Sequence, residues 1–289
     1  MSGAQITPPG PPSVDTRGVT RPRTGFPFLD SVLDQPGSVL AFAHRGGAYH
    51  PDLEGLENTL TAFRHAVDLG YAYLETDVHV TRDGTLLAFH DAALDRVTAH
   101  TGKVAELSYA EVAEAVVGER EKVPTMDSLL EEFPGVRFNI DLKSDAAVPA
   151  LAELVRRHGA YDRVCVGSFS DRRTTRFRRL VGDRVATAAG PVDVGLFRFV
   201  PAPRVVDALT RGRGAALQVP HRRGRVTVVT EALVARAHAL GRHVHVWVVD
   251  EPDHMHELLD LGIDGLMTDR TDLLRDVLVA RGQWSGATR

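Results

Sequence analysis

Short apolar runs alternate with amphipathic stretches along the chain from about residue 38 onward. Eight of these runs have the character of buried strands, centred near residues 40, 75, 138, 165, 186, 217, 246 and 266. The segments between them repeat apolar residues at helical spacing, as 58–69 does at Leu60, Phe63, Ala66 and Val67. Strands that alternate with helices predict repeated β-α units and a parallel sheet.

Eight β-α units predict a (β/α)8 TIM barrel, with a doubly wound open sheet as the alternative. The length of 289 residues agrees, because such barrels commonly occupy about 250 residues as one domain. Asp83-Gly84 between two extended runs predicts a β-hairpin after the second strand. Residues 92–124 have a less regular pattern, and we expect them to form a small insertion after that hairpin. We expect a proline-rich, disordered lead over 1–25 and a single domain over 26–289.

The composition of the chain excludes some classes of binding partner and indicates where in the cell the protein acts. A net charge of −4 and a pI near 6.3 argue against a nucleic-acid partner. Cys165 is the only cysteine, which excludes a disulfide within the chain and cysteine-based zinc sites. No apolar run approaches the roughly 18 residues of a membrane span, and the N-terminus lacks the apolar core of a signal peptide. These observations predict a cytoplasmic protein without stable membrane insertion.

The basic loop 221–225 (H-R-R-G-R) follows a predicted strand. Loops in this position lie on the catalytic rim of a barrel. A weak contact with an anionic substrate tail or lipid headgroup is therefore the alternative to a merely solvated loop.

Polar residues gather at the ends of the predicted strands. Catalytic residues of β/α barrels come from the carboxyl ends of the strands. The residues found there are His44 and Arg45 on the first strand, Glu75 and Asp77 on the second, Asp141 and Lys143 on the third, Ser168 on the fourth, Trp247 on the seventh and Asp269 just after the eighth. Their shared position supports the barrel and predicts one site on one rim.

The acidic residues of this group predict a metal site. Glu75 and Asp77 are two apart on a strand, so both side chains point to the same face. Two such carboxylates repel each other unless a cation lies between them, and Asp141 would complete a three-carboxylate pocket. Oxygen ligands select a hard cation, Mg²⁺ or Ca²⁺. The alternative is an acidic pair neutralised by Lys143.

The basic residues suggest proton transfer and phosphate binding. His44 and His90 each close a predicted strand, and histidine accepts and donates protons near neutral pH. Arg45 and Lys143 suit a phosphate, which arginine binds through two oxygens at once. The two glycines after Arg45 would let the backbone approach a ligand closely. Asp91 follows His90 directly, and adjacent residues on an extended chain point apart, so we do not expect it to orient His90.

An ordered set of motifs extends from about residue 38 to 280. It comprises H-R-G at 44–46, E-N-T at 57–59, E-T-D-V at 75–78, T-R-D-G at 81–84, H-D at 90–91, L-x-R-V-T at 94–98, D-L-K at 141–143, G-S-F at 167–169, V-W-V-V at 246–249 and G-L-M-T-D at 265–269. The set resembles the glycerophosphodiester phosphodiesterases, which are (β/α)8 barrels with a small inserted segment after the hairpin.

The resemblance implies metal-dependent hydrolysis of glycerophosphodiesters to glycerol 3-phosphate and an alcohol, with water or the glycerol 2-hydroxyl as nucleophile. It implies His44 and His90 as the acid/base pair, Glu75, Asp77 and Asp141 as ligands of one divalent cation, Arg45 and Lys143 at the phosphate, Glu57 in a motif that lines the site, and Trp247 beside the glycerol. Two positions depart from the family: Asp141 stands where Glu is usual, and Asp250 where Asn is frequent.

Two other functions compete with this one. A lysophospholipase D acts on lysophospholipids, and its acyl substrate would need an exposed apolar strip near the mouth of the site. The loop 48–56 and the insertion 92–124 are the expected places, and neither is strongly apolar, which favours soluble substrates. A non-catalytic barrel that acts as a binding protein is disfavoured because both histidines and all three acids are present.

Overall fold

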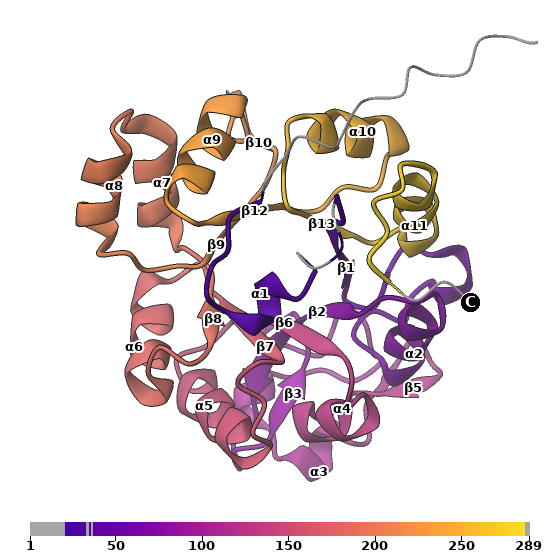
Figure 1. Ribbon diagram of the computed structural model, residues 1–289. Coiled ribbons are helices and arrows are strands. Elements are labelled where there is room, and N and C mark those ends of the chain that lie inside the picture. Colours follow the sequence, from indigo (N-terminus) through magenta and orange to yellow (C-terminus); the bar gives the residue numbers. More distant parts are fainter. Residues whose placement is uncertain (1–20, 33–34, 36, 287–289) are drawn as a thin grey trace, which may run out of the picture.

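The computed structural model describes residues 21–32, 35 and 37–286, and their strands form a barrel (Figure 1). The barrel strands are β1 (Leu40–His44), β2 (Tyr73–Val80), β6 (Arg137–Leu142), β7 (Val164–Gly167), β8 (Ala186–Thr187), β9 (Ala216–Val219), β12 (His243–Val246) and β13 (Gly265–Thr268). Their pairings are parallel, and β1 pairs with both β2 and β13. A bridge between Ala188 and Ala216 joins the remaining two edges. The predicted barrel is confirmed, and the open sheet is excluded.

Helices surround the strands (Figure 1). They are α2 (Leu60–Asp68), α4 (Met126–Glu132), α5 (Ala147–Arg157), α6 (Asp171–Val181), α7 (Pro191–Phe199), α8 (Pro203–Thr210), α9 (Glu231–Ala239), α10 (Pro252–Asp260) and α11 (Thr271–Ala280). Thr59, Thr125 and Thr230 cap α2, α4 and α9 by accepting a backbone N–H bond. Apolar helix faces pack on the strands in the main core. Among the helices described, none is long and apolar enough to cross a membrane.

The chain after β2 forms the predicted β-hairpin. β3 (Leu86–Ala88) pairs antiparallel with β2 and confirms the hairpin. Residues 92–124 then form η3 (Val104–Glu106), α3 (Tyr109–Val112), β4 (Val116–Val117) and β5 (Glu121–Lys122). Apolar side chains of this segment, among them Leu94 and Val112, pack with Leu87 and Phe89 in a small cluster of their own.

The amino-terminal end of the barrel is filled from inside. The short helix α1 (Pro27–Asp30) lies within the ring of strands (Figure 1), and its Phe28 and Leu29 pack with Phe42 and Tyr73 in a second core. Just before α1, the guanidinium of Arg21 reaches the buried carboxylate of Asp264. Residues 1–20 of the predicted lead lie outside the described residues.

Candidate active site

A pocket of about 250 Å³ lies at the carboxyl ends of the barrel strands. It is lined by His44, Arg45, Glu75, Asp77, His90, Asn139, Asp141, Lys143, Phe169, Gln218, Trp247, Val248 and Met267. Every predicted site residue except Glu57 therefore lines one cavity. Glu57 lies behind Arg45, which it contacts through an ion pair at 3.2 Å.

Strand register brings the three carboxylates together. In the β2–β6 pair Glu75 lies beside Asn139 and Asp77 beside Asp141, so these side chains share the inner face. The ammonium of Lys143, just past β6, lies 2.8 Å from both Asp77 Oδ1 and Asp141 Oδ2. The predicted acidic group is thus in contact with the predicted lysine.

Negative charge exceeds positive charge on the floor of this pocket, where three carboxylates face Arg45 and Lys143. Burial, and then the charge of Asp77, raise the pKa of Glu75 well above its usual range. Burial also raises the pKa of Asp141 despite the opposing charge of Lys143. For Asp77 burial is outweighed by Lys143 and Arg45, which lower its pKa. The upward pKa shifts of Glu75 and Asp141 indicate that the two basic side chains compensate only part of the buried negative charge.

The carboxylate oxygens of this floor fit a divalent cation. Asp77 Oδ2 and Asp141 Oδ2 are buried and accept no well-directed hydrogen bond. Arg45 Nε lies 3.4 Å from Asp77 Oδ2, and Lys143 Nζ lies 2.8 Å from Asp141 Oδ2. Buried anionic oxygens without such a bond are costly. The donor atoms are all oxygens, which suits a hard cation such as Mg²⁺ or Ca²⁺.

Among the residues that the structure describes, two other clusters of histidine and acidic side chains lie outside this pocket. They are His50, Asp52 and His65, and His221, His254 and Glu257, each with ligand atoms within 4.8 Å of one another. In the second cluster the two rings share a hydrogen bond at 2.6 Å. None of these residues lines the catalytic pocket.

His44 is held by a hydrogen-bonded relay to Asp269. The sequence analysis placed both residues on the rim but did not predict that they pair. His44 Nδ1 lies 2.7 Å from Asp269 Oδ1, at the end of β13, and His44 Nε2 lies 3.7 Å from Glu75. Burial lowers the pKa of His44, but Glu75 and Asp269 outweigh it and raise that pKa. Asp250 Oδ1 in turn accepts bonds from the Asp269 backbone N–H and the Thr268 hydroxyl. The departure at Asp250 thus retains an acceptor that braces the relay.

His90 is oriented by its neighbour, contrary to our expectation. Its Nδ1 lies 2.5 Å from Asp91 Oδ1, and the other oxygen of Asp91 accepts from Arg96 Nε. The expectation assumed an extended chain, but β3 ends at Ala88 and residues 90 and 91 lie in a bend. The bend turns both side chains to the same side.

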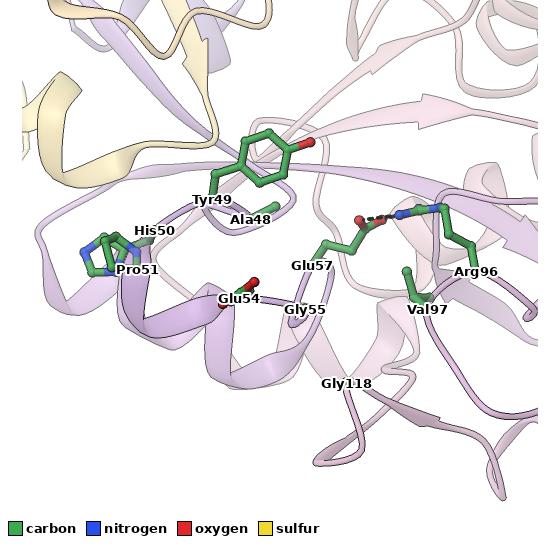
Figure 2. A pocket seen from close by; sticks show the side chains of 10 residues that line it. All are labelled: Ala48, Tyr49, His50, Pro51, Glu54, Gly55, Glu57, Arg96, Val97 and Gly118. Carbon is green, nitrogen blue, oxygen red and sulfur yellow. Dashed lines mark hydrogen bonds and ion pairs between the residues drawn. The ribbon is translucent and has the colours of Figure 1, made fainter.

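Glu57 connects two arginines beside the catalytic pocket. Its carboxylate accepts from Arg45 at 3.2 Å and from two nitrogens of Arg96 at 2.6 and 2.8 Å. Burial opposes ionisation of Glu57, but the bond from Arg96 and the charge of Arg45 outweigh it and lower its pKa. Figure 2 shows Glu57 and Arg96 on the wall of a second pocket of about 560 Å³, which Tyr49 and Glu54 also line. Glu57 therefore positions Arg45 and borders this neighbouring space.

The glycines after Arg45 serve packing more than ligand approach. A Cβ on Gly46 would lie 2.7 Å from Ala62 Cβ, and one on Gly47 would lie 2.8 Å from Thr271 Cγ2. Both also have positive φ, where side chains are strained. The turn after β1 is thus pressed against α2 and α11, which explains the glycine pair.

The pocket also contains residues that the sequence analysis did not select. Gln218 Nε2 donates to Asn139 Oδ1 at 2.7 Å across the floor. Phe169 meets Trp247 edge to face with ring centroids 5.7 Å apart and forms an apolar wall. Asn139 was detectable, because it precedes Asp141 by two on one strand and so shares its face.

Comparison with known proteins identifies the family of the chain. The model of the glycerophosphoryl diester phosphodiesterase family matches residues 44–273. The chain belongs to this family. A Mycobacterium tuberculosis relative named "Probable glycerophosphodiester phosphodiesterase 2" is 42% identical over 255 residues, covering 87% of this chain and 95% of the relative. The human "Lysophospholipase D GDPD1" is 28% identical over 270 residues, covering 82% and 85%.

The fold of this family member also matches a solved structure. A phosphodiesterase from Oleispira antarctica, in complex with the product sn-glycerol-3-phosphate, superposes with a TM-score of 0.68. It is 20% identical, and the match covers 83% of this chain and 96% of that one. The likeness concerns the barrel. The family assignment identifies the chain as an enzyme, a phosphoric diester hydrolase, rather than a non-catalytic barrel.

Proposed function

We propose that the chain hydrolyses glycerophosphodiesters to glycerol 3-phosphate and an alcohol in the pocket at the carboxyl ends of the strands. One observation carries the proposal: His44 and His90, each tethered at Nδ1 by a carboxylate, line the same cavity as Arg45 and three acidic residues. A phosphodiester needs a cationic surface for its charge and two proton carriers for its reacting oxygens. His44 and His90 are the proton carriers, and Arg45 and Lys143, together with a cation that the three acids would hold, would supply the positive charge.

We assign metal binding to Glu75, Asp77 and Asp141, with Mg²⁺ or Ca²⁺ as the ion. Such a cation, when bound, neutralises charge on the scissile phosphate as a Lewis acid. Arg45 contributes a planar guanidinium held in place by Glu57, and Lys143 contributes a point charge. These residues orient the phosphate and lower the energy of the more highly charged transition state.

The two histidines carry the protons. One removes a proton from the nucleophile, and the other protonates the leaving alcohol. Asp269 and Asp91 orient the two rings at Nδ1, which leaves each Nε2 for the transfer. The nucleophile is water or the glycerol 2-hydroxyl, and the latter would first give a cyclic phosphate.

Phosphorus-31 NMR tests this function. The chelated enzyme is incubated with glycerophosphocholine, glycerophosphoethanolamine and glycerophosphoglycerol, and Mg²⁺ or Ca²⁺ is then added. The expected result is replacement of the diester signal by glycerol 3-phosphate after metal addition, with a cyclic phosphate signal if the hydroxyl attacks. No conversion of any diester with either metal would refute the proposal.

A second substrate class has its own support, because one relative carries the name lysophospholipase D. A lysophospholipid is a glycerophosphodiester with one acyl chain, so the same reacting groups would serve. The deciding feature is a place for that chain.

A further inference from the structure

An apolar pocket of about 280 Å³ opens beside the catalytic cavity. The two share Phe169, Gln218 and Trp247 as lining residues. The rest of its lining comes from α7 and from the β9–α9 loop, which contains the hairpin of β10 (Arg222–Arg223) and β11 (Val226–Thr227). A ligand at the reacting phosphate can therefore extend along the Phe169–Trp247 wall without leaving the protein surface.

The walls of this pocket are mainly apolar and unusually exposed. Pro191, Val194, Pro220 and Val228 line it together with Phe199 and Val226. Phe199 is 70% exposed, Phe169 67% and Val226 45%. Exposed large apolar side chains grouped around one cavity mark a binding surface. The apolar strip that the sequence analysis sought in 48–56 and 92–124 is therefore present, but on α7 and this hairpin.

Gly195 keeps the pocket open. It lies in the middle of α7, where glycine costs about 1 kcal/mol relative to alanine. Its φ is not positive, and a Cβ built there meets no atom within 4 Å. Neither backbone conformation nor close packing requires glycine at this position. Gly195 does line the cavity, so a side chain there would occupy the space.

Two arginines make the rim of the pocket cationic. Arg198 and Arg223 both line it, and Arg198 is held by a bond from its Nε to the Thr227 carbonyl. The basic loop of the sequence analysis is thus placed beside an apolar cavity. A cationic rim around an apolar space suits an amphiphile whose charged part is a phosphate.

We propose that this pocket binds the acyl chain of a monoacyl glycerophosphodiester, a lysophospholipid, and that Gly195 determines this specificity. The inference rests on the proposed hydrolysis at the same site. The acyl chain is attached to the glycerol, so the glycerol faces Trp247 and the alcohol faces the polar pocket beside Glu57 and Arg96. Water adds across the bond between phosphorus and the alcohol oxygen. The products are acyl glycerol 3-phosphate and the alcohol, with no redox change.

A chain-length series tests the proposal. Wild-type enzyme with metal is assayed on glycerophosphocholine and on 1-acyl lysophosphatidylcholines from hexanoyl to dodecanoyl, each below its critical micelle concentration, with choline release as the readout. Full burial of one methylene strengthens binding about fourfold. Dodecanoyl has six more methylenes than hexanoyl, so even partial burial of them should raise kcat/KM at least about tenfold across the series.

Gly195→Phe fills the pocket, and Val205→Phe on the exposed side of α8 is the matched control. Gly195→Phe should reduce the chain-length gain to about twofold or less while glycerophosphocholine hydrolysis stays at the wild-type rate. Val205→Phe should preserve the gain. Gly195→Ala serves as a second variant, because it favours the helix and should retain most of the gain.

The outcomes separate the inference from the function on which it rests. If glycerophosphocholine is hydrolysed but kcat/KM does not rise with chain length, the acyl site is refuted and the function stands. If the gain persists in folded Gly195→Phe, the chain binds elsewhere and the assignment is also refuted. If the enzyme hydrolyses neither glycerophosphocholine nor the lysophosphatidylcholines, the proposed function itself is refuted.

Discussion

The two ends of the barrel differ in how far the charge of their buried acidic residues is compensated by neighbouring groups. At the carboxyl end, Glu75, Asp77 and Asp141 crowd together, and two of their oxygens lack a well-directed hydrogen bond. At the amino end, Asp264 is a single buried carboxylate whose Oδ2 accepts bonds from His238 and the Val244 backbone. Its Oδ1 also lacks a well-directed hydrogen bond, but it lies 3.3 Å from the Arg21 guanidinium.

The pKa directions express the same contrast. Burial tends to raise the pKa of Asp264, but His238, His243 and Arg21 outweigh it and lower that pKa. For Glu75 and Asp141 the net shift is upward. At the amino end the buried negative charge is compensated, which favours stability. At the carboxyl end part of the negative charge stays uncompensated, which favours the binding of a cation. Barrels commonly divide catalysis and stability between their two ends in this way.

The largest expected effect is on catalysis at the carboxyl end. His44→Ala or His90→Ala removes a proton carrier and should lower kcat by at least about 10²–10⁴-fold. A coupled assay of glycerol 3-phosphate measures the rate, and circular dichroism checks the fold. His100→Ala, an exposed histidine, is the control. Near-normal turnover in either folded variant would contradict the assignment.

The amino end should respond in stability instead. Asp264→Asn leaves Arg21 and His238 without their anion and should lower the free energy of unfolding by about 3–5 kcal/mol. Urea denaturation measures the change, with Asp253→Asn on the exposed side of α10 as control. A normal free energy of unfolding combined with lost activity would reverse our assignment of the two ends.

The pH dependence of Asp264 has a definite sign. Its pKa is lowered in the fold, so its stabilising contribution is complete above the unfolded value of about 3.9 and is lost as pH falls below it. Wild type should therefore lose more stability than Asp264→Asn between about pH 5 and 2. Equal losses in both proteins would argue against a paired Asp264.

Metal should stabilise the carboxyl end. At about 100 times its dissociation constant, Mg²⁺ or Ca²⁺ should add about 2.7 kcal/mol to the chelated wild type. Asp141→Asn should lose most of that gain, which differential scanning fluorimetry detects as a smaller rise in Tm. Asp145→Asn, an exposed carboxylate nearby, should keep the full rise. An equal rise in Asp141→Asn would exclude Asp141 as a ligand.

The smallest expected effect concerns the support of Arg45. Glu57→Gln removes a charged partner of that guanidinium and should raise KM about tenfold, with a smaller change in kcat. Steady-state kinetics on glycerophosphocholine measure both constants. Glu54→Gln, on the wall of the neighbouring pocket, is the control. An unchanged KM would show that Arg45 needs no support from Glu57.

The sequence predicted the barrel because its eight apolar runs and intervening amphipathic helices are periodic, local signals. It also predicted residues at strand ends, because parallel strands place those ends on one rim. His44, Asp77 and Asp141 follow from that rule together with the family motifs. The physical basis is that the rim position depends only on where each strand ends.

What the sequence missed depends on contacts between distant strands or on local bends. The pairing of His44 with Asp269 joins β1 to β13, and the Asn139–Gln218 bond crosses the barrel. Asp91 was misjudged because the chain bends after β3. The apolar pocket escaped notice because α7 and the hairpin contribute its walls from separate segments.

The central claim is that the carboxyl rim is a metal-assisted histidine phosphodiesterase site. Its most direct test is glycerol 3-phosphate release from glycerophosphocholine by wild type and His44→Ala, each assayed with chelator and after Mg²⁺ or Ca²⁺ is restored. We predict activity only in wild type with metal. Equal turnover by wild type in chelator, or by folded His44→Ala with metal, would contradict the account.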